Sequence, residues 1–177
     1  MSTQDAMGPV VVRDARPEDD GVVGELLVEA FITQYAKKLP EVVYTDERKR
    51  ELRDVAARRK IASVKVAELA GEVVGTVALF PPGAPGSEAW LPNAADLRGL
   101  ATSVKLHGKG LSRPLLDAAE DQARSWGVDA ICLHVRRGAE GVARMYMNRG
   151  YVREPSGDMS LPSVFLEAYV MRLKSPA

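Results

Sequence analysis

The sequence is poor in cysteine, histidine and aromatic residues, and it carries no excess charge of either sign. Its 177 residues include one cysteine, two histidines and 6% aromatic residues. A single thiol excludes an intramolecular disulfide, and Cys132 lies in the apolar run AICLHV, where a buried structural thiol is expected. The 24 basic and 24 acidic residues cancel, so there is no net charge to attract nucleic acid or an acidic membrane surface.

The sequence also lacks the segments that direct a chain to or across a membrane. Its N-terminus, MSTQDAMGPVVVRD, has neither the basic segment nor the long apolar core of a secretion signal, and no later apolar run is long enough to span a bilayer. We therefore expect a cytoplasmic protein. Its length and its apolar content of 46% fit one domain, residues 1–177, with a core from about residue 10 to residue 173.

Hydrophobic periodicity predicts a mixed α/β protein. The expected order is β-α-α-β-β-β-α-β-α-β-β, which indicates a mixed sheet with helices on its faces. The first half comprises a strand at 10–12, a helix from Asp19 or Asp20 to Pro40, a helix from Asp46 to about Lys60, and a hairpin of strands 61–69 and 73–80. The second half comprises a strand at 96–102, a helix at 111–126, a strand at 130–135, a short helix at 140–148 and a strand at 165–173.

The stretch KLHGKGLSRPLL, residues 105–116, places two glycines between an apolar strand and an amphipathic helix. Glycine lets a ligand approach the backbone, and a helix start presents unpaired N–H groups with partial positive charge, so the stretch indicates an anion site. A dinucleotide-binding fingerprint is disfavoured because position 113 is arginine. A Walker-type phosphate loop is disfavoured because Gly110 is followed by Leu-Ser.

The same stretch resembles the signature of the GNAT superfamily of acetyl-CoA-dependent N-acyltransferases, Arg/Gln-x-x-Gly-x-Gly/Ala, here His107-Gly108-Lys109-Gly110-Leu111-Ser112. The segment ARMYMNRGY resembles the later A-x-x-L-Y-x-x-x-G-F segment of that family, and the likeness is strongest from Asp96 to Val152. Three positions depart from the family pattern: His107, Ser112 and Glu140, which replaces a common asparagine.

The resemblance implies a mostly antiparallel central sheet with parallel, splayed fourth and fifth strands. It implies that main-chain N–H groups of the loop bind the pyrophosphate of coenzyme A, and that the fourth strand pairs with pantetheine and supplies an N–H toward the thioester oxygen. The expected cofactor-binding residues are Leu100, Ala101, Thr102, His107, Gly108, Lys109, Gly110, Leu111, Ser112 and Arg113.

The resemblance also implies acetyl transfer to a primary amine by direct attack on the thioester. Tyr146 occupies the position that in many family members protonates the leaving thiolate, although a pKa of about 10 against about 8.5 makes full transfer uphill by roughly 2 kcal/mol. Asp96 is the candidate base, provided that it is desolvated. Glu68, His134 or a water chain are alternatives.

Other interpretations of these residues stay open at this point. The glycines serve only turn geometry in one of them, Tyr146 packs on Val142 as a core residue in a second, and Asp96 is a solvated turn residue in a third. Arg136 and Arg137 either meet a 3′-phosphate or are solvated, and Trp90 either lines the acceptor pocket or anchors its loop.

Three functions are consistent with these residues. They are an N-acetyltransferase acting on a small-molecule or protein amine, a non-catalytic acyl-CoA-binding or sensing domain, and a binding module for another phosphate ligand. We expect no metal, no nucleic acid and no membrane partner, and either a monomer or a homodimer.

Overall fold

The computed structural model describes residues 8–38 and 45–173. The expected helix end at Pro40 lies outside these ranges. The chain divides into two compact units, residues 1–78 with 99–119 and residues 79–98 with 120–177. No helix within the described ranges is both long enough and apolar enough to cross a bilayer.

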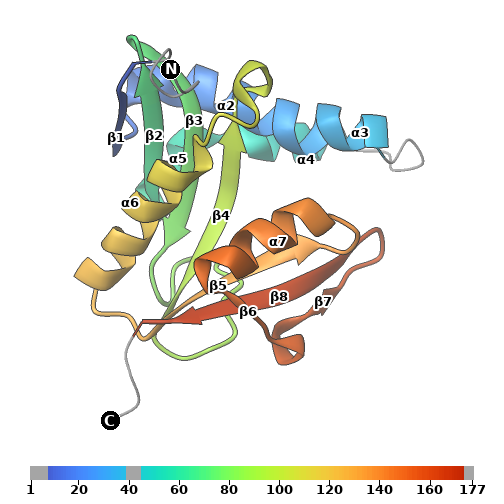
Figure 1. Ribbon diagram of the computed structural model, residues 1–177. Helices are drawn as coiled ribbons and strands as arrows, with labels where there is room; N and C mark the ends of the chain where they lie inside the picture. The colour runs from blue at the N-terminus through green and yellow to red at the C-terminus, as the bar shows by residue number, and fades with distance from the viewer. Residues whose placement is uncertain (1–7, 39–44, 174–177) are drawn as a thin grey trace. The chain divides into compact units, whose positions relative to one another are not determined.

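The strands form one mixed sheet in the order β1-β2-β3-β4-β5-β8-β6, with β7 paired to β8 (Figure 1). Its β4–β5 pair is parallel, whereas β1–β2, β5–β8, β6–β8 and β7–β8 are antiparallel. This confirms the predicted fold class. The strands are β1 (Val10–Asp14), β2 (Ser63–Leu69), β3 (Glu72–Phe80), β4 (Ala94–Thr102), β5 (Ala130–Arg136), β6 (Val152–Arg153), β7 (Met159–Ser160) and β8 (Phe165–Arg172).

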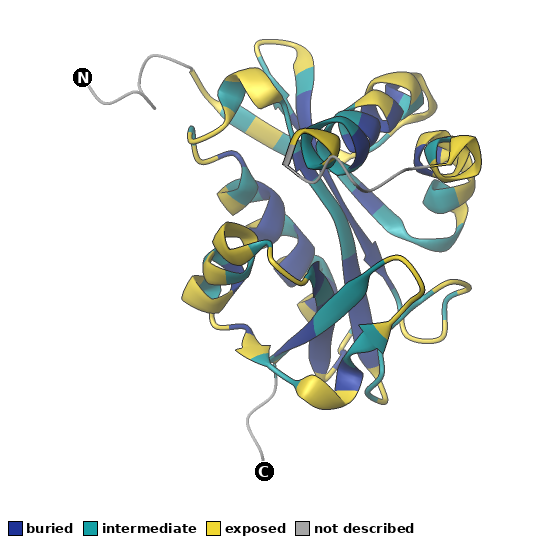
Figure 2. Ribbon diagram, turned by 90° about the vertical axis from the view of Figure 1, so that its right-hand side faces the viewer, coloured by how far each residue is buried: buried dark blue, intermediate teal, exposed yellow. Residues whose placement is uncertain are grey.

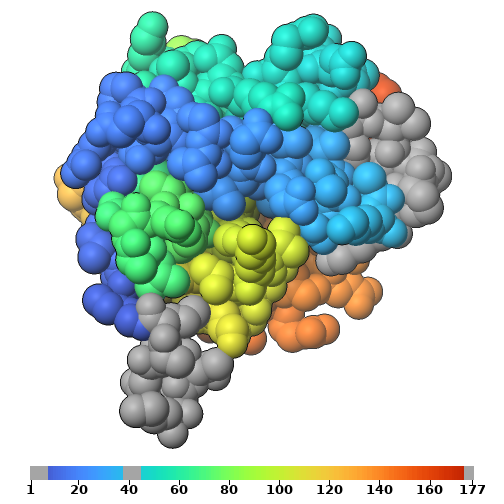
Figure 3. Space-filling model, turned by 90° about the horizontal axis from the view of Figure 1, so that it is seen from above, coloured from blue at the N-terminus to red at the C-terminus, as the bar shows by residue number. Residues whose placement is uncertain are grey.

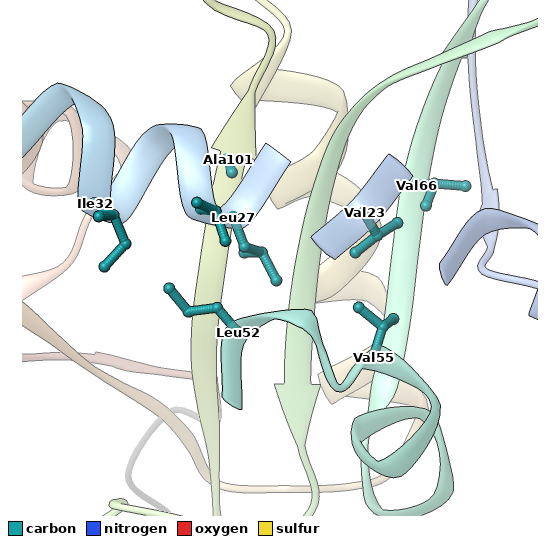
Figure 4. Close-up of a cluster of buried hydrophobic side chains, with 8 residues drawn as sticks. Val23, Leu27, Ile32, Leu52, Val55, Val66 and Ala101 are labelled. Carbon is teal, nitrogen blue, oxygen red and sulfur yellow. The ribbon is translucent and has the colours of Figure 1, made fainter. Parts of the chain in front are cut away.

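The first unit packs helices on its strands through a cluster of aliphatic side chains (Figure 4). Apolar residues recur at helical spacing along the first helical stretch, so one face of it is buried. The cluster contains Val23, Leu27, Val28, Ile32, Leu52, Val55, Val66 and Ala101. The helices of this stretch are η1 (Pro17–Asp19), α2 (Asp20–Val28), the π-helical η2 (Glu29–Thr33) and α3 (Gln34–Lys38).

The single helix expected from Asp46 to about Lys60 is wrong. The structure has α4 (Asp46–Arg53) and α5 (Val55–Ile61), separated at Asp54, whose φ of −81° and ψ of 64° are not helical. The Asp54 carboxylate accepts a hydrogen bond of 3.2 Å from the Ala57 N–H and so caps α5. A capping side chain competes with the helical backbone, and this local competition outweighs the continuous apolar periodicity.

The expected hairpin is present, but its first strand begins at Ser63 because Ile61 ends α5. Its turn places Ala70 and Gly71 at φ values of 51° and 82°. Two successive positive φ values are the geometry of a tight hairpin turn whose twist matches the flanking strands.

The second unit contains the first part of β4, up to Arg98, and the strands β5, β6, β7 and β8. It also contains α7 (Glu140–Arg149) and η4 (Pro155–Gly157). Helix α7 crosses β5 and β8 in Figure 1, and it ends, as predicted, before Gly150, which has a φ of 109°. Buried residues, dark blue in Figure 2, line the strands, while the outward helix faces are exposed.

The two faces of the sheet in this unit are covered by different elements. Directly paired residues point to the same face, and the register places Ala94 beside Ala130 and Cys132 beside Val170. These four residues form a cluster with Ala89, Trp90 and Leu91 of the loop 81–93. The even-numbered residues of β5, of β8 and of the β4 segment 94–98 therefore face the loop, whereas Tyr169 faces Ala143 and Met147 of α7.

Candidate functional site

The glycine stretch connects β4 to α6 (Ser112–Ser125) through the 3₁₀ turn η3 (Val104–Leu106). Gly108 and Gly110 both have a φ of 79°, a conformation that other residues adopt only with strain. Among the described residues, apart from its two chain neighbours, no heavy atom lies within 4 Å of a Cβ built on Gly108. Its glycine is therefore required by the backbone conformation rather than by packing against a neighbour.

The N–H groups of the stretch divide into two sets. The N–H groups of Leu106, His107 and Lys109 donate to carbonyls of the preceding turn at 3.0, 3.3 and 3.2 Å. Within residues 8–38 and 45–173, the N–H groups of Gly108 and Gly110 have no backbone acceptor. They lead into the unpaired donors at the start of α6, which together form an anion-binding geometry.

The side chains of the stretch differ in their exposure to solvent. His107 and Arg113 are exposed, and Lys109 and Ser112 are half-buried. Leu111 is buried and anchors the start of α6, followed on the same helix by the buried Leu115. In Figure 3 the stretch is the yellow surface next to the blue helices of the first unit. The backbone donors are thus presented at the surface by a helix that is fixed in the core.

Strand β4 precedes the stretch, and its edge toward β5 is hydrogen-bonded to β5 over a short length only. The β4–β5 ladder covers Ala94–Asp96 and Ala130–Cys132 only. Leu100, Ala101 and Thr102 lie beyond it, and only Ala101 of the three is buried. An unpaired strand edge offers N–H and C=O groups to an extended ligand.

Gly99 distorts β4 where this ladder has ended, and sequence analysis missed it. Its φ is 63°, and a Cβ there would lie 3.4 Å from Leu27 Cδ2. A positive φ inside a strand is the mark of a bulge, which redirects the N–H groups that follow it. The signal in the sequence was an isolated glycine within a strand pattern.

Tyr146 is a buried residue of α7 with an aromatic neighbour. Its ring meets the ring of Tyr151 edge to face, with centroids 5.5 Å apart and an interplanar angle of 73°. The alternative partner Val142 is 42% exposed. The contact with Tyr151 is therefore the aromatic packing that orients the Tyr146 ring.

Tyr151 is itself fixed by an ion pair, a support that the sequence did not reveal. Its hydroxyl donates to Glu120 Oε2 at 3.4 Å, and Glu120 accepts two bonds of 2.9 Å from the Arg149 guanidinium. Burial and the nearby Glu120 carboxylate raise the pKa of Tyr151 well above its usual range, so its hydroxyl stays protonated. Tyr146 thus packs on a neutral, anchored ring.

Asp96 is wholly buried, which contradicts its interpretation as a solvated turn residue. Strand β4 begins two residues earlier, at Ala94. Asp96 Oδ2 accepts a hydrogen bond of 2.8 Å from the Glu88 N–H and forms an ion pair of 2.8 Å with Arg98 Nε. Burial raises the pKa of Asp96, while the Arg98 guanidinium opposes that rise.

The other residues on the loop side of the sheet adjoin this carboxylate. Arg98 also forms an ion pair with Glu88, whose carboxylate lies 3.8 Å from His134 Nδ1. His134 Nε2 lies 2.8 Å from the Gly157 carbonyl and therefore carries the hydrogen. Sequence analysis missed Glu88 and Arg98, although Arg98 is two residues after Asp96 on a strand and so shares its face.

Trp90 anchors its loop within this unit. Its ring lies edge to face with His134 at 5.2 Å between centroids. A Cβ on Gly157 would lie only 2.3 to 2.6 Å from the indole. The glycine therefore creates the space in which the indole lies over the sheet.

Tyr146 and Asp96 lie on opposite faces of the sheet in the second unit. Tyr146 belongs to α7, on the side of Tyr169, whereas Asp96 contacts the loop 81–93 on the other side. Glu68, the alternative base, belongs to β2 in the first unit, and its carboxylate accepts a 2.8 Å bond from Arg13. Asp96 has its pKa raised by burial, which is the condition set for it as a base.

Arg136 and Glu140 line the same surface depression of about 260 Å³, together with Arg144, Met147, Glu167 and Tyr169. Arg137, in contrast, stacks on the Phe165 ring at 3.6 Å from its centroid. Glu140, at the start of α7, thus shares this depression with two arginines, Arg136 and Arg144.

Comparisons with known proteins agree with this geometry. A model of the acetyltransferase (GNAT) family matches residues 24–151, and no curated protein sequence matches the chain. Among solved structures, an acetyltransferase of the GNAT family from Staphylococcus aureus Mu50 is 14% identical, with a TM-score of 0.71 over 94% of this chain and 100% of its own.

Two similar structures contain the cofactor. PaiA N-acetyltransferase from Thermoplasma acidophilum, in complex with coenzyme A, is 19% identical, with a TM-score of 0.66 over 91% of this chain and 98% of its own. YncA from Salmonella typhimurium, a putative acetyltransferase with acetyl-CoA, is 20% identical, with a TM-score of 0.68 over 96% of this chain and 97% of its own. Identities this low show a shared fold.

Proposed function

Because the chain belongs to the GNAT acetyltransferase family, we propose that it is an N-acetyltransferase that transfers the acetyl group of acetyl-CoA to a primary amine. The observation that carries this proposal is the pair of positive-φ glycines whose N–H groups lead into the start of α6. Such a surface suits the pyrophosphate of coenzyme A. The two cofactor-bound structures of the same fold support it.

The cofactor is bound mainly by backbone groups in this proposal. N–H groups of Gly108, Gly110, Leu111 and Ser112 hold the pyrophosphate, and the backbone of residues 100–102 holds pantetheine. Lys109 and Arg113 add side-chain charge. Since main-chain N–H groups do not depend on the side chain, the departures at His107 and Ser112 leave the donors in place.

The transfer requires one proton acceptor and one proton donor. The acceptor ammonium loses a proton to Asp96, and its nitrogen forms a bond to the thioester carbon. The C–S bond breaks, and the Tyr146 hydroxyl protonates the leaving thiolate. The nitrogen loses its second proton after the attack, and this proton replaces the one that Tyr146 gave to the thiolate. Asp96 releases its proton to solvent, so that the reaction yields an amide, a thiol and one proton.

The opposite faces of Tyr146 and Asp96 suit these roles. In a direct attack the nucleophile enters on one side of the carbonyl and the thiolate leaves toward another, so the acid and the base need not be neighbours. The alternative, a non-catalytic acyl-CoA-binding or sensing domain, is favoured by the exclusion of Asp96 from solvent. Turnover distinguishes the two.

The test is ligand-dependent stability followed by turnover. At a hundred times its dissociation constant acetyl-CoA adds about 2.7 kcal/mol, which raises the Tm of a chain of this size by about 5 to 10 °C. An equal concentration of ATP or NAD gives a smaller shift because neither has a pantetheine arm. An amine panel with detection of free thiol then reports acetyl transfer.

The variant Gly110→Glu is expected to abolish acetyl-CoA binding, since it places bulk and negative charge against the pyrophosphate. Gly83→Glu is its control, because Gly83 also has a positive φ, of 76°, with open space around it, but lies in the loop 81–93. A Tm shift with acetyl-CoA that survives Gly110→Glu and is lost in Gly83→Glu contradicts the proposed site.

A further inference from the structure

Arg98 forms ion pairs with two carboxylates, those of Glu88 and of the proposed base Asp96. Its Nε lies 2.8 Å from Asp96 Oδ2, and its guanidinium also pairs with Glu88. The guanidinium carbon lies 5.2 Å from the centroid of the Phe80 ring. The Arg98 side chain is 32% exposed, and the Asp96 side chain only 1%. The cation therefore stands between the buried carboxylate and the surface.

The two oxygens of Asp96 have different environments. Oδ2 accepts a hydrogen bond from the Glu88 N–H and forms an ion pair with Arg98 Nε. Oδ1 is buried and has no hydrogen-bond partner within the described part of the chain. A buried oxygen without a donor is costly, and a catalytic role is one explanation for it. Asp96 is also the last β4 residue of the β4–β5 ladder.

We propose that Arg98, held by Glu88, is a positioning residue that keeps the buried Asp96 carboxylate ionised through Oδ2 and leaves Oδ1 to accept the proton of the substrate amine. This inference rests on the proposed acetyltransferase function. The N–H bond of the ammonium breaks, an O–H bond forms at Oδ1, and the nitrogen keeps its electron pair for attack on the thioester carbon.

Four groups with titratable or charged side chains face Asp96 from the elements around it. Arg98 of β4 and His134 of β5 lower its pKa, whereas Glu88 of the loop raises it. Cys132 of β5 is the fourth, and burial raises the pKa of its thiol, which therefore stays neutral. Burial has the largest effect and raises the pKa of Asp96, and the nearby cation and anion, which can be removed separately, modify that rise.

The pH dependence of kcat/KM tests the inference, because its acidic limb reports the base of the free enzyme. Arg98→Met removes the cation and moves the acidic limb upward by about one to three pH units. Glu88→Gln removes the opposing anion and moves the limb downward. Arg98→Lys restores a positive charge and returns the limb toward its wild-type position.

Arg153 provides a matched control in the same unit. Its guanidinium also lies between two carboxylates, Asp158 at 2.6 Å and Glu167 at 3.0 Å, and over an aromatic ring, Tyr169, at 5.8 Å. Arg153→Met removes an equivalent network away from Asp96, so it leaves the acidic limb unmoved. If losing any ion pair had this effect, Arg98→Met and Arg153→Met would move the acidic limb of kcat/KM alike.

A carboxyl titration by ¹³C NMR on substrate-free protein gives a second measurement. The pH midpoint of the Asp96 titration is expected to move upward in Arg98→Met and downward in Glu88→Gln. Opposite shifts in both measurements support the inference, and shifts of the same sign or no shift overturn it. If Arg98→Met does not fold, Glu88→Gln and Arg98→Lys carry the same test.

The failure of the inference differs from the failure of the proposed function. Wild-type turnover with an acidic limb that none of these variants moves overturns only the role of Arg98. Acetyl-CoA binding without turnover of any amine by the wild type overturns the catalytic function, and the role of Arg98 with it.

Discussion

At the scale of single residues, Tyr146 and Tyr151 show how two similar side chains differ in what they can do. Their rings touch, but the Tyr151 hydroxyl is committed to Glu120 and has a raised pKa. A phenol whose pKa is raised by burial is a poor proton donor. Tyr151 is therefore not the proton donor in our proposal, which keeps Tyr146, at the position that the family resemblance marks, as the donor to the thiolate.

Tyr146→Phe keeps the ring that packs on Tyr151 and removes only the hydroxyl. If that hydroxyl protonates the thiolate, kcat falls by about 10²- to 10⁴-fold, with little change in acetyl-CoA affinity. The rate is measured where chemistry limits turnover. Wild-type kcat in this variant would assign the proton to water.

Tyr151→Phe is the companion variant. It removes the 3.4 Å bond to Glu120 and is expected to lower the free energy of unfolding by about 1 kcal/mol, with kcat retained. Tyr146→Phe should thus lower kcat, whereas Tyr151→Phe should lower the free energy of unfolding.

At the scale of elements, the loop 81–93 and η4 depend on each other through one glycine. The indole of Trp90 lies where a side chain on Gly157 would be, and it covers Ala94, Cys132 and Val170 of the sheet. The loop therefore keeps its place over Asp96 by packing rather than by regular secondary structure.

Gly157→Ala should displace the Trp90 loop. The added methyl group would lie 2.3 Å from the indole, and overpacking of this kind costs about 1 to 3 kcal/mol. Urea unfolding measures the loss, and a change in tryptophan fluorescence reports the indole. Gly141→Ala is the control, because it adds a methyl group to a helix in open space. Equal stability of Gly157→Ala and the wild type would show that the loop moves freely.

At the scale of the whole molecule, each of the two units contains an acid that an arginine stabilises. Hydrogen bonds from Arg13 lower the pKa of Asp19 in the first unit, and those from Arg153 lower the pKa of Asp158 in the second. A carboxyl with a lower pKa in the folded state stabilises the fold above its unfolded pKa, about 3.9. That contribution disappears as the pH falls through the folded value.

The free energy of unfolding should therefore fall below about pH 4, as measured by urea unfolding from pH 7 to pH 2.5. Arg13→Met and Arg153→Met lower the stability at pH 7 and reduce the loss of stability between pH 7 and pH 2.5, because each removes the cause of one pKa shift. Asp14→Asn, at a carboxylate that is 77% exposed, leaves the slope unchanged. Unaltered acid limbs in both arginine variants would mean that other carboxyls cause the acid sensitivity.

Sequence analysis predicted the parts of the fold that depend on short-range patterns. The hairpin, the strand before the glycines, α6 and α7 follow from period-two and helical spacing and from glycine at helix ends. The break at Asp54 was not predicted, because an aspartate within an amphipathic pattern fits both a helix interior and a cap. The β4 start at Ala94 was missed because alanine has no strong strand preference.

Apart from the break at Asp54, the amino-acid sequence by itself determined the order of the main helices and strands and the bare glycine backbone before α6, since both depend on the steric limits of individual residues and on hydrophobic periodicity. Only the tertiary structure decided the environment of Asp96. Its burial, and its contacts with Arg98, the Glu88 N–H and His134, join residues from β4, β5 and a loop. The pKa of a carboxyl depends on solvent exclusion and on charges within a few ångströms, and residues far apart in the chain supply both.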